Sequence, residues 1–277
     1  MSTPVQTKAV QLRALHTQPG PLVLPNVWDA ASAALVQSAG ATAVATTSAG
    51  ISWSLGRADG HGLSLDEMAA AVRRIASVVA VPVTADIEGG YGAAPAAVAK
   101  SVATVVAAGA AGINLEDSTG ADEPLYGIDA QRERIVAARQ AAVEAGVPDL
   151  FINARTDVFL AGVGDAGKRT GLVRERAEAY AAAGADLLFV PGLLDLAVIE
   201  SVVADSPLGI NIMALPGGPS VKELQAVGVR RVSVGMAIAQ AAYDLVRRSA
   251  TELLNEGTYT SFASGVDFGE INSLVSP

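Results

Sequence analysis

A short phrase recurs five times along this chain: small residues, a glycine, and then an apolar run. It reads QSAGATAVATT, VAAGAAGINLED, VEAGVPDLFINAR, AAAGADLLFVPG and QAVGVRRVSVG. The glycine of each copy lies where a helix would end in the left-handed cap conformation. The five glycines are Gly40, Gly109, Gly146, Gly184 and Gly228. Each following run is short and bounded, as buried parallel strands are. The repeat therefore predicts helices that alternate with buried strands.

Extended over the whole chain, this pattern predicts eight strand–helix units. The strands are expected near 22–25, 42–47, 81–86, 112–116, 150–154, 186–190, 208–212 and 230–234. The helices are expected near 29–39, 65–79, 95–108, 129–145, 171–183, 195–204, 220–227 and 236–250. Strict alternation indicates a parallel sheet, and eight units in about 230 residues suit a (β/α)8 barrel of the TIM type.

The alternative is an open, doubly wound sheet. That fold usually carries a glycine fingerprint after its first strand, and the segment LPNVWDAASAA has none. We therefore predict one α/β barrel domain over residues 1–277. Residues 251–277 follow the eighth unit and are too few for a domain of their own. We expect them to form a C-terminal helical extension that caps the barrel or reaches a partner subunit.

Composition excludes several classes of function. The chain has no cysteine, which rules out disulfides, thiolate metal sites and cysteine catalysis and makes a cytoplasmic location the expectation. Its net charge is −9, from 19 basic and 28 acidic residues, and no basic stretch suggests a nucleic-acid partner. No apolar run approaches the roughly 18 residues of a membrane span. The first residues, MSTPVQTKAVQL, lack the apolar core of a secretory signal.

The stretch TADIEGGYG at 84–92 is the strongest indication of chemistry. A β-type run delivers two acids, Asp86 and Glu88, and then breaks into glycines around Tyr91. Carboxylates at the tip of a strand supply oxygen ligands for a hard metal ion, and glycines let the backbone approach a small anion. A solvated acidic turn is the alternative for this segment alone.

The predicted C-terminal strand ends are unusually polar, and in a barrel of this type the chemistry lies at that end. These residues are Asn26, Asp29, Thr46, Thr47, Ser48, Asp86, Glu88, Glu116, Asp117, Asn153, Arg155, Asp157 and Asn211. Mainly glycine and alanine stand at the opposite ends. Solvation alone does not account for this asymmetry.

With these segments in order, the chain resembles the isocitrate lyase/phosphoenolpyruvate mutase superfamily over about residues 20 to 250. The matching segments are LPNVWDAASA, TTSAGISWSLGRAD, ADIEGGYG, GINLED and NARTDVF. The resemblance implies a (β/α)8 barrel, often with its eighth helix exchanged between the subunits of a homodimer or homotetramer. It also implies a Mg²⁺ ion, with Mn²⁺ as an alternative, and a small 2-oxo acid or dicarboxylate bound at the strand ends.

The resemblance also implies roles for individual residues. Asp86 resembles the acid that contacts the metal, and Asp59, Glu88 and Glu116 resemble the acids that hold its water ligands. Mg²⁺ dehydrates reluctantly, which suits such a set.

On the substrate side, Thr47, Ser48 and Ala49 match the segment that grips the substrate carboxylate. Arg155 resembles the arginine that faces the oxo acid or its developing enolate, where a fixed cation stabilises charge as it forms. Asn211 falls where the methylisocitrate lyase branch uses an asparagine for substrate carboxylates.

Structural readings of several of these polar residues stay open. Arg155 and Asp157 could form a structural ion pair, and Asp117 is expected to be a structural or supporting acid rather than a metal ligand. Asn211 could be a turn residue. Two histidines are set aside: His61 is expected to be a solvated loop residue, and His16 a surface residue on an N-terminal helix.

The chain departs from the lyase branches just after the Glu116–Asp117 pair. Those branches carry a Lys-Lys/Arg-Cys-Gly-His loop, and this chain reads EDSTGADEPLYG at 116–127. Cysteine-dependent cleavage of isocitrate or methylisocitrate is therefore excluded. The lysine of the mutase and phosphonopyruvate hydrolase branches is also missing, and Pro191 stands where the mutase has a histidine. Phosphonate chemistry is accordingly the second choice.

The functional prediction is a Mg²⁺-dependent C–C lyase or decarboxylase that acts on a small 2-oxo or 2-hydroxy acid through an enolate. Decarboxylation needs only a polarised carbonyl and a stabilised enolate. C–C cleavage of the retro-aldol type would add a general acid or base, for which Tyr91, Glu88 or a loop residue could serve, beside Arg155 and Glu116. The alternatives are a phosphonopyruvate-type P–C hydrolase or mutase, and a barrel that binds oxo acids without turning them over.

Overall fold

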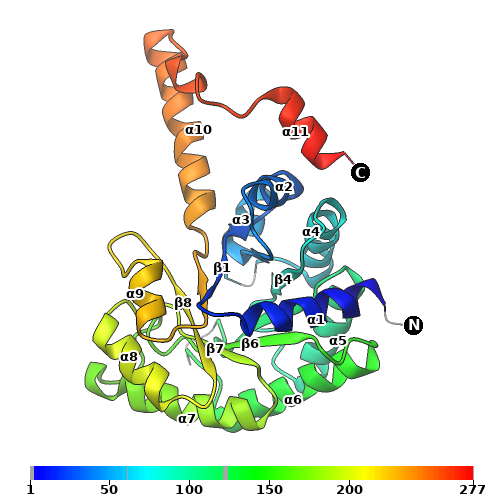
Figure 1. Cartoon of the computed structure of the whole chain (residues 1–277), viewed down its shortest axis with the longest axis vertical. Helices are drawn as coiled ribbons and strands as arrows, with labels where there is room; N and C mark the ends of the chain where they lie inside the picture. The colour runs from blue at the N-terminus through cyan, green and yellow to red at the C-terminus, as the bar shows by residue number, and fades with distance from the viewer. Residues whose placement is uncertain (1–2, 61, 121–123, 277) are drawn as a thin grey trace.

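In the computed structural model, which describes residues 3–60, 62–120 and 124–276, the sheet consists of parallel strands that surround a common axis (Figure 1). The strands are β1 Leu22–Leu24, β2 Asn26–Val27, β3 Val44–Thr46, β4 Val83–Asp86, β5 Gly112–Glu116, β6 Phe151–Arg155, β7 Leu187–Phe189, β8 Gly209–Met213 and β9 Arg231–Ser233. Their hydrogen-bonded order is β1-β9-β8-β7-β6-β5-β4-β3-β2. The predicted barrel is confirmed, and each of the eight predicted strand regions contains strand structure.

The first strand region is divided in two, which accounts for the ninth strand. β1 pairs with β9, whereas β2 pairs with β3, and Pro25 between them has no N–H to donate to a ladder. The side chain of Asn26 spans the junction. Its Oδ1 accepts from the N–H groups of Val234 and Gly235 at 2.9 Å each, and its Nδ2 donates to the Thr46 carbonyl at 2.9 Å. Asn26 therefore joins the two ends of the sheet.

Helices precede, separate and follow the strands along the chain. They are α1 Pro4–His16, α2 Ala30–Ser38, α3 Ser48–Ser54, α4 Leu65–Val78, α5 Pro95–Ala107, α6 Ile128–Glu144, α7 Arg169–Ala182, α8 Leu196–Asp205, α9 Val221–Ala226, α10 Ala237–Glu256 and α11 Phe268–Val275. The five repeat glycines all have positive φ, as their predicted cap positions require. The sequence did not predict α3, which follows β3 directly and belongs to the candidate site.

Helix α1 corrects the expectation for His16. The residue is 8% exposed, and its ring stacks on Phe151 with 3.9 Å between centroids. Burial, followed by the nearby charge of Arg231, lowers the pKa of His16 to about 3, so the ring is neutral. In the same helix, Leu12 is fully buried and lies against Gly112 at the start of β5. α1 therefore closes the N-terminal end of the barrel, opposite the polar strand ends.

Helix α10, which follows the last strand, rises away from the barrel (Figure 1). Only Ala239 and Ser249 of this helix are buried. After it the chain turns back, and α11 packs against α2. Within the described ranges, no helix is both long and apolar enough to cross a membrane.

Candidate functional site

Neighbouring strands bring the predicted acids together at the C-terminal end of the barrel. Asp86 ends β4, Glu116 ends β5 and Arg155 ends β6. The parallel register sets Asp86 beside Asn114, and Glu116 beside Arg155. Glu88 follows two residues after Asp86, and its backbone carbonyl accepts from the Glu116 N–H at 3.0 Å. Asp86, Glu88 and Glu116 are 8%, 3% and 7% exposed, so these carboxylates lie inside the site rather than in solvent.

Two acids hold Arg155 in place. Its Nε and Nη2 donate to the two carboxylate oxygens of Asp157, at 2.6 and 2.8 Å. Its Nη1 lies 2.8 Å from Oε2 of Glu116. The ion pair with Asp157 is thus present. A guanidinium carries five N–H donors, so these contacts leave two for a ligand. Burial opposes the charge, but Glu116 and Asp157 raise the pKa of Arg155, which stays a cation.

The site contains more carboxyl groups than basic groups. Asp86, Glu88, Glu116 and Asp157 are all buried, Glu116 and Asp157 pair with Arg155, and the buried cation Arg231 lies near enough to Asp86 for its charge to be felt. Burial raises the pKa of Asp86. Burial also raises the pKa of Glu116 to about 8, with neighbouring carboxylates adding to the shift and Arg155 opposing it. A bound divalent cation would supply the missing positive charge, so the residues suit a metal.

The arrangement suits a hydrated ion better than one enclosed by the protein. Among the described residues, no three histidine, aspartate or glutamate side chains are grouped closely enough to hold a metal directly. Asp59 lies in the exposed loop between α3 and α4, and its charge contributes to the raised pKa of Asp86, which indicates that the two are near each other. Mg²⁺ commonly takes one or two carboxylates and keeps several waters, in agreement with this set.

The segment predicted to grip a carboxylate lies beside Asp86. Thr47 caps α3, and its hydroxyl accepts from the Gly50 N–H. Ser48 donates to Oδ2 of Asp86 from its hydroxyl at 3.1 Å and from its backbone N–H at 3.4 Å. Ala49 is buried next to it. The carboxylate that Ser48 binds in this structure is thus that of Asp86, and its predicted role toward a substrate stays a prediction.

An unpredicted arginine shapes the loop that follows Asp86. Arg134 of α6 is fully buried and donates to the carbonyls of Gly89, Gly92 and Ala93. The loop between these carbonyls contains Tyr91, whose φ of +57° is rare for a residue other than glycine. Burial and then the charge of Glu88 raise the pKa of Tyr91, so its phenol keeps its proton near neutral pH.

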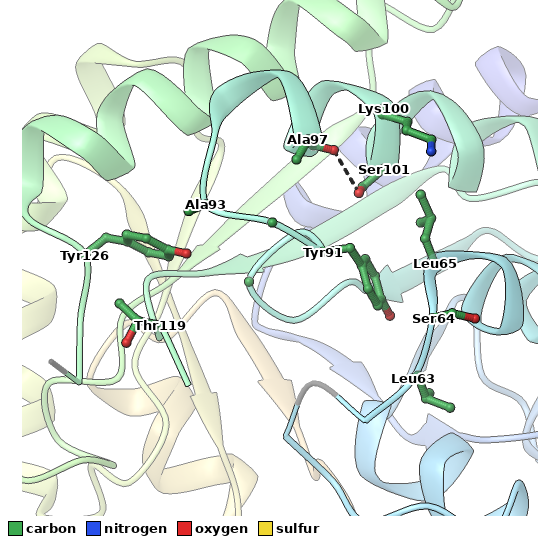
Figure 2. A pocket seen from close by; sticks show the side chains of 12 residues that line it. Leu63, Ser64, Leu65, Tyr91, Ala93, Ala97, Lys100, Ser101, Thr119 and Tyr126 are labelled. Carbon is green, nitrogen blue, oxygen red and sulfur yellow. Dashed lines mark hydrogen bonds between the residues drawn. The ribbon is translucent and has the colours of Figure 1, made fainter. Parts of the chain in front are cut away.

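A cavity of about 710 Å³ borders this loop (Figure 2). It is lined by Leu63, Ser64, Leu65, Gly89, Tyr91, Gly92, Ala93, Ala97, Lys100, Ser101, Thr119 and Tyr126. The strand-end acids and Arg155 are not among these lining residues. Tyr91 links the two regions, because it lines the cavity while the charges of Asp86, Glu88 and Glu116 act on its hydroxyl. His61, which the sequence analysis set aside as a loop residue, lies outside the described residues, as do residues 121–123.

Asn211 is a strand residue rather than a turn residue. It lies in β8, is fully buried, and accepts at Oδ1 from the Ser233 hydroxyl at 3.4 Å. Its neighbour across the ladder is Arg231, a fully buried cation that the sequence did not single out. Arg231 donates from Nη2 to Asn114 at 3.4 Å, and burial lowers its pKa to about 9. The barrel interior below the acids is therefore polar as well.

The chain is similar to several known proteins in sequence and fold. The 2-methylisocitrate lyase of Escherichia coli (strain K12) is 33% identical over 265 residues, covering 90% of this chain and 85% of that protein. The oxaloacetate decarboxylase of Rhodopseudomonas palustris (strain BisB18) is 32% identical over 212 residues, covering 71% and 68%. A crystal structure from Burkholderia cenocepacia J2315, named a "putative lyase/mutase", superposes with a TM-score of 0.91 at 39% identity, covering 99% of this chain and 98% of that one.

These two curated relatives are named as a lyase and a decarboxylase of small acids, and a 2,3-dimethylmalate lyase from Eubacterium barkeri is 30% identical over 279 residues, covering 96% of this chain and 93% of that protein. The family model described as phosphoenolpyruvate phosphomutase matches residues 12–254. That range includes every strand of the barrel and all the acids of the site. The chain therefore belongs to the phosphoenolpyruvate phosphomutase family, within the isocitrate lyase/phosphoenolpyruvate mutase superfamily.

Proposed function

We propose that this protein is a divalent-metal-dependent lyase or decarboxylase that breaks a C–C bond in a small 2-oxo or 2-hydroxy acid through an enolate. One observation carries the proposal: Arg155 is fixed between Glu116 and Asp157 at the strand ends, within a cluster of buried carboxylates. The relatives named as 2-methylisocitrate lyase and oxaloacetate decarboxylase support the substrate class.

Different residues of the chain would bind different groups of the substrate. The Ser48 hydroxyl and N–H, which bind a carboxylate oxygen of Asp86 here, would bind the substrate carboxylate instead. The two remaining N–H donors of Arg155 would face the 2-oxo oxygen. A cation that is already ordered stabilises charge as it develops, without reorganisation at the moment of reaction. Arg155 would thus favour the enolate over the neutral oxo acid.

Asp86 would hold the metal, with Asp59, Glu88 and Glu116 binding its water ligands. When bound, Mg²⁺ or Mn²⁺ would polarise the substrate carbonyl. The same acids explain why a metal would be required for substrate binding, because without a cation they would repel an anionic substrate. Magnesium titration of the parent protein and of the Asp86→Ala variant tests this assignment.

Proton transfer has two candidates. Glu116, whose pKa is raised to about 8 in the metal-free site, is ionised once the metal is bound and can then accept a proton from a substrate hydroxyl. Tyr91 keeps its proton under the same conditions but is a weaker acid, because its pKa lies above the usual value. A group whose pKa is close to the working pH transfers protons more effectively. Glu116 is therefore our preferred general base, and Tyr91 the group that can donate a proton to the carbanion.

A substrate panel tests the reaction. We expect pyruvate or a related acid to form from oxaloacetate or from a branched 2-hydroxy acid in the presence of Mg²⁺, and Arg155→Met to reduce turnover at least about 100-fold. Phosphate release from phosphonopyruvate would favour P–C bond chemistry instead. Thermal stabilisation by oxo acids without consumption of any substrate would favour a binding protein.

We further propose that the protein works as a homodimer or homotetramer in which α10 packs on another subunit. Large apolar side chains of this helix are exposed: Leu245 by 45%, Val246 by 63%, Leu253 by 47% and Leu254 by 82%. The outer face of β1 is uncovered as well, with Val23 41% exposed. Exposed apolar surface of this kind marks association sites. We also propose that the chain forms a single barrel domain with residues 251–277 as its extension, and that the protein is located in the cytoplasm.

A further inference from the structure

The buried residue Asp117 hydrogen-bonds to the backbone of the segment that carries Arg155. Asp117 is fully buried and follows Glu116 at the end of β5. Its own N–H donates to the Arg155 carbonyl at 3.1 Å. Its Oδ1 accepts from the backbone N–H of Asp157 at 3.0 Å. One acid therefore binds the backbone on both sides of Thr156, the residue between Arg155 and its ion-pair partner.

Helix α7 fixes this acid from the other side. Tyr180 donates its hydroxyl to Oδ2 of Asp117 at 2.8 Å, and Arg176 donates Nε to the same oxygen at 3.1 Å. The two residues are four positions apart, so they share one face of the helix. Tyr180 is fully buried and Arg176 is 8% exposed. A buried carboxylate with this many donors is held in one position.

From this geometry we infer that Asp117, fixed by Tyr180 and Arg176, is a positioning residue for Arg155. It holds the backbone of Asp157, and Asp157 in turn grips Nε and Nη2 of Arg155 at 2.6 and 2.8 Å. These two hydrogen bonds determine which N–H groups of the Arg155 guanidinium remain available to the substrate. The inference deepens the proposed function and depends on it for the identity of the substrate, but not for the position of Arg155.

Asp186 provides a matched control at the other end of the barrel. It precedes β7, accepts from the Ile152 N–H at 2.8 Å, and pairs with Arg139 at 2.6 Å and Arg13 at 2.7 Å. Like Asp117, it joins a strand backbone to an arginine from a covering helix. It differs in lying at the start of β6, where it bonds to Ile152 rather than to the backbone of Asp157. Asp117→Asn removes one ion pair and Asp186→Asn removes two, so an effect on the site that came from general destabilisation would be at least as large in the control.

The experiment compares oxalate binding, measured by calorimetry with saturating Mg²⁺, and the Arg155 Nε–H signal in ¹⁵N spectra, assigned from its loss in Arg155→Lys. Oxalate is the probe because it is planar like an enolate. We expect Asp117→Asn to weaken oxalate about 10–100-fold, the usual effect of removing a supporting hydrogen-bond partner, and to shift the Nε–H signal or broaden it by exchange. Asp186→Asn should lower the melting temperature and leave both readouts unchanged.

Tyr180→Phe keeps the inference falsifiable if Asp117→Asn does not fold. It removes one hydrogen bond without adding a charge, and should change both readouts in the same direction by a smaller factor. An unchanged oxalate affinity and Nε–H signal in a folded Asp117 or Tyr180 variant would overturn the inference. Equal losses in Asp186→Asn would also overturn it. If the parent protein binds no oxalate, the proposed function fails, and the Nε–H signal still decides the positioning role.

Discussion

The raised pKa of Glu116 predicts that magnesium binds more tightly as the pH rises. Burial raises this pKa to about 8, so near neutral pH the metal-free site carries a proton that must leave before the carboxylate can hold a metal-bound water. For one such proton the apparent association constant is divided by 1 + 10^(pKa − pH), a factor of about 100 at pH 6 and about 2 at pH 8. Affinity should therefore rise about 50-fold over this interval. Asp86, whose pKa burial also raises, can only steepen the dependence.

Calorimetric titration of the metal-free protein with MgCl₂, in buffers of different ionisation enthalpy, measures the affinity and the number of protons released together. We expect close to one proton released at pH 6.5 and a flatter affinity profile above pH 8. The matched variant Glu116→Gln cannot titrate, so it should lose most of the pH dependence. Magnesium affinity that is constant from pH 6 to pH 8, or binding without proton release in the parent protein, would refute the reasoning.

Three further predictions address metal, stability and assembly. Asp86→Ala should abolish Mg²⁺ binding and leave the melting temperature of the metal-free protein equal or higher, because it relieves repulsion among buried acids; magnesium binding like that of the parent would remove the metal assignment. In the metal-free protein the folded-state pKa of Glu116 is about 8, above the ordinary 4.5, so between these pH values the folded state binds more protons than the unfolded state. The free energy of unfolding should therefore fall as the pH rises from 4.5 to 8. Chemical denaturation at pH 5 and pH 8 checks the sign. Leu254→Glu on α10 should reduce the mass measured by light scattering to that of a smaller assembly. The control variant Val136→Glu changes an apolar residue of α6 that is 51% exposed, and it should leave the mass unchanged. A parent protein that is monomeric at micromolar concentration would contradict the proposed assembly.

The barrel could be predicted because its information is local. Each repeat glycine marks the end of a helix, and each apolar run that follows is a strand, so the order of elements is readable along the chain. Two features were missed for physical reasons. The break at Pro25 depends on where the sheet closes, which involves β9 far along the chain. Helix α3 is short and lies in a segment read as a substrate-binding loop.

The site was predictable only in part. Residues at strand ends, such as Asp86 and Arg155, were identified because position on a strand determines which end of the barrel they occupy. Supporting residues from other elements were not, since Arg134, Arg176 and Tyr180 look like ordinary helix residues until tertiary packing buries them. His16 was misjudged for the same reason: a polar residue near the terminus is buried because α1 closes the barrel.

Oxalate binding with and without magnesium tests the central claim most directly. The claim is that buried acids hold a divalent metal, and that this metal, Ser48 and Arg155 together bind an enolate-like anion. Without metal the acids should repel a dianion. Because oxalate resembles the planar enolate more closely than a ground-state oxo acid does, it should bind more tightly than pyruvate. We predict calorimetric oxalate binding in the presence of Mg²⁺ that is lost on addition of EDTA. Oxalate affinity unchanged by EDTA, or weaker than that of pyruvate, would contradict both the metal site and the enolate mechanism.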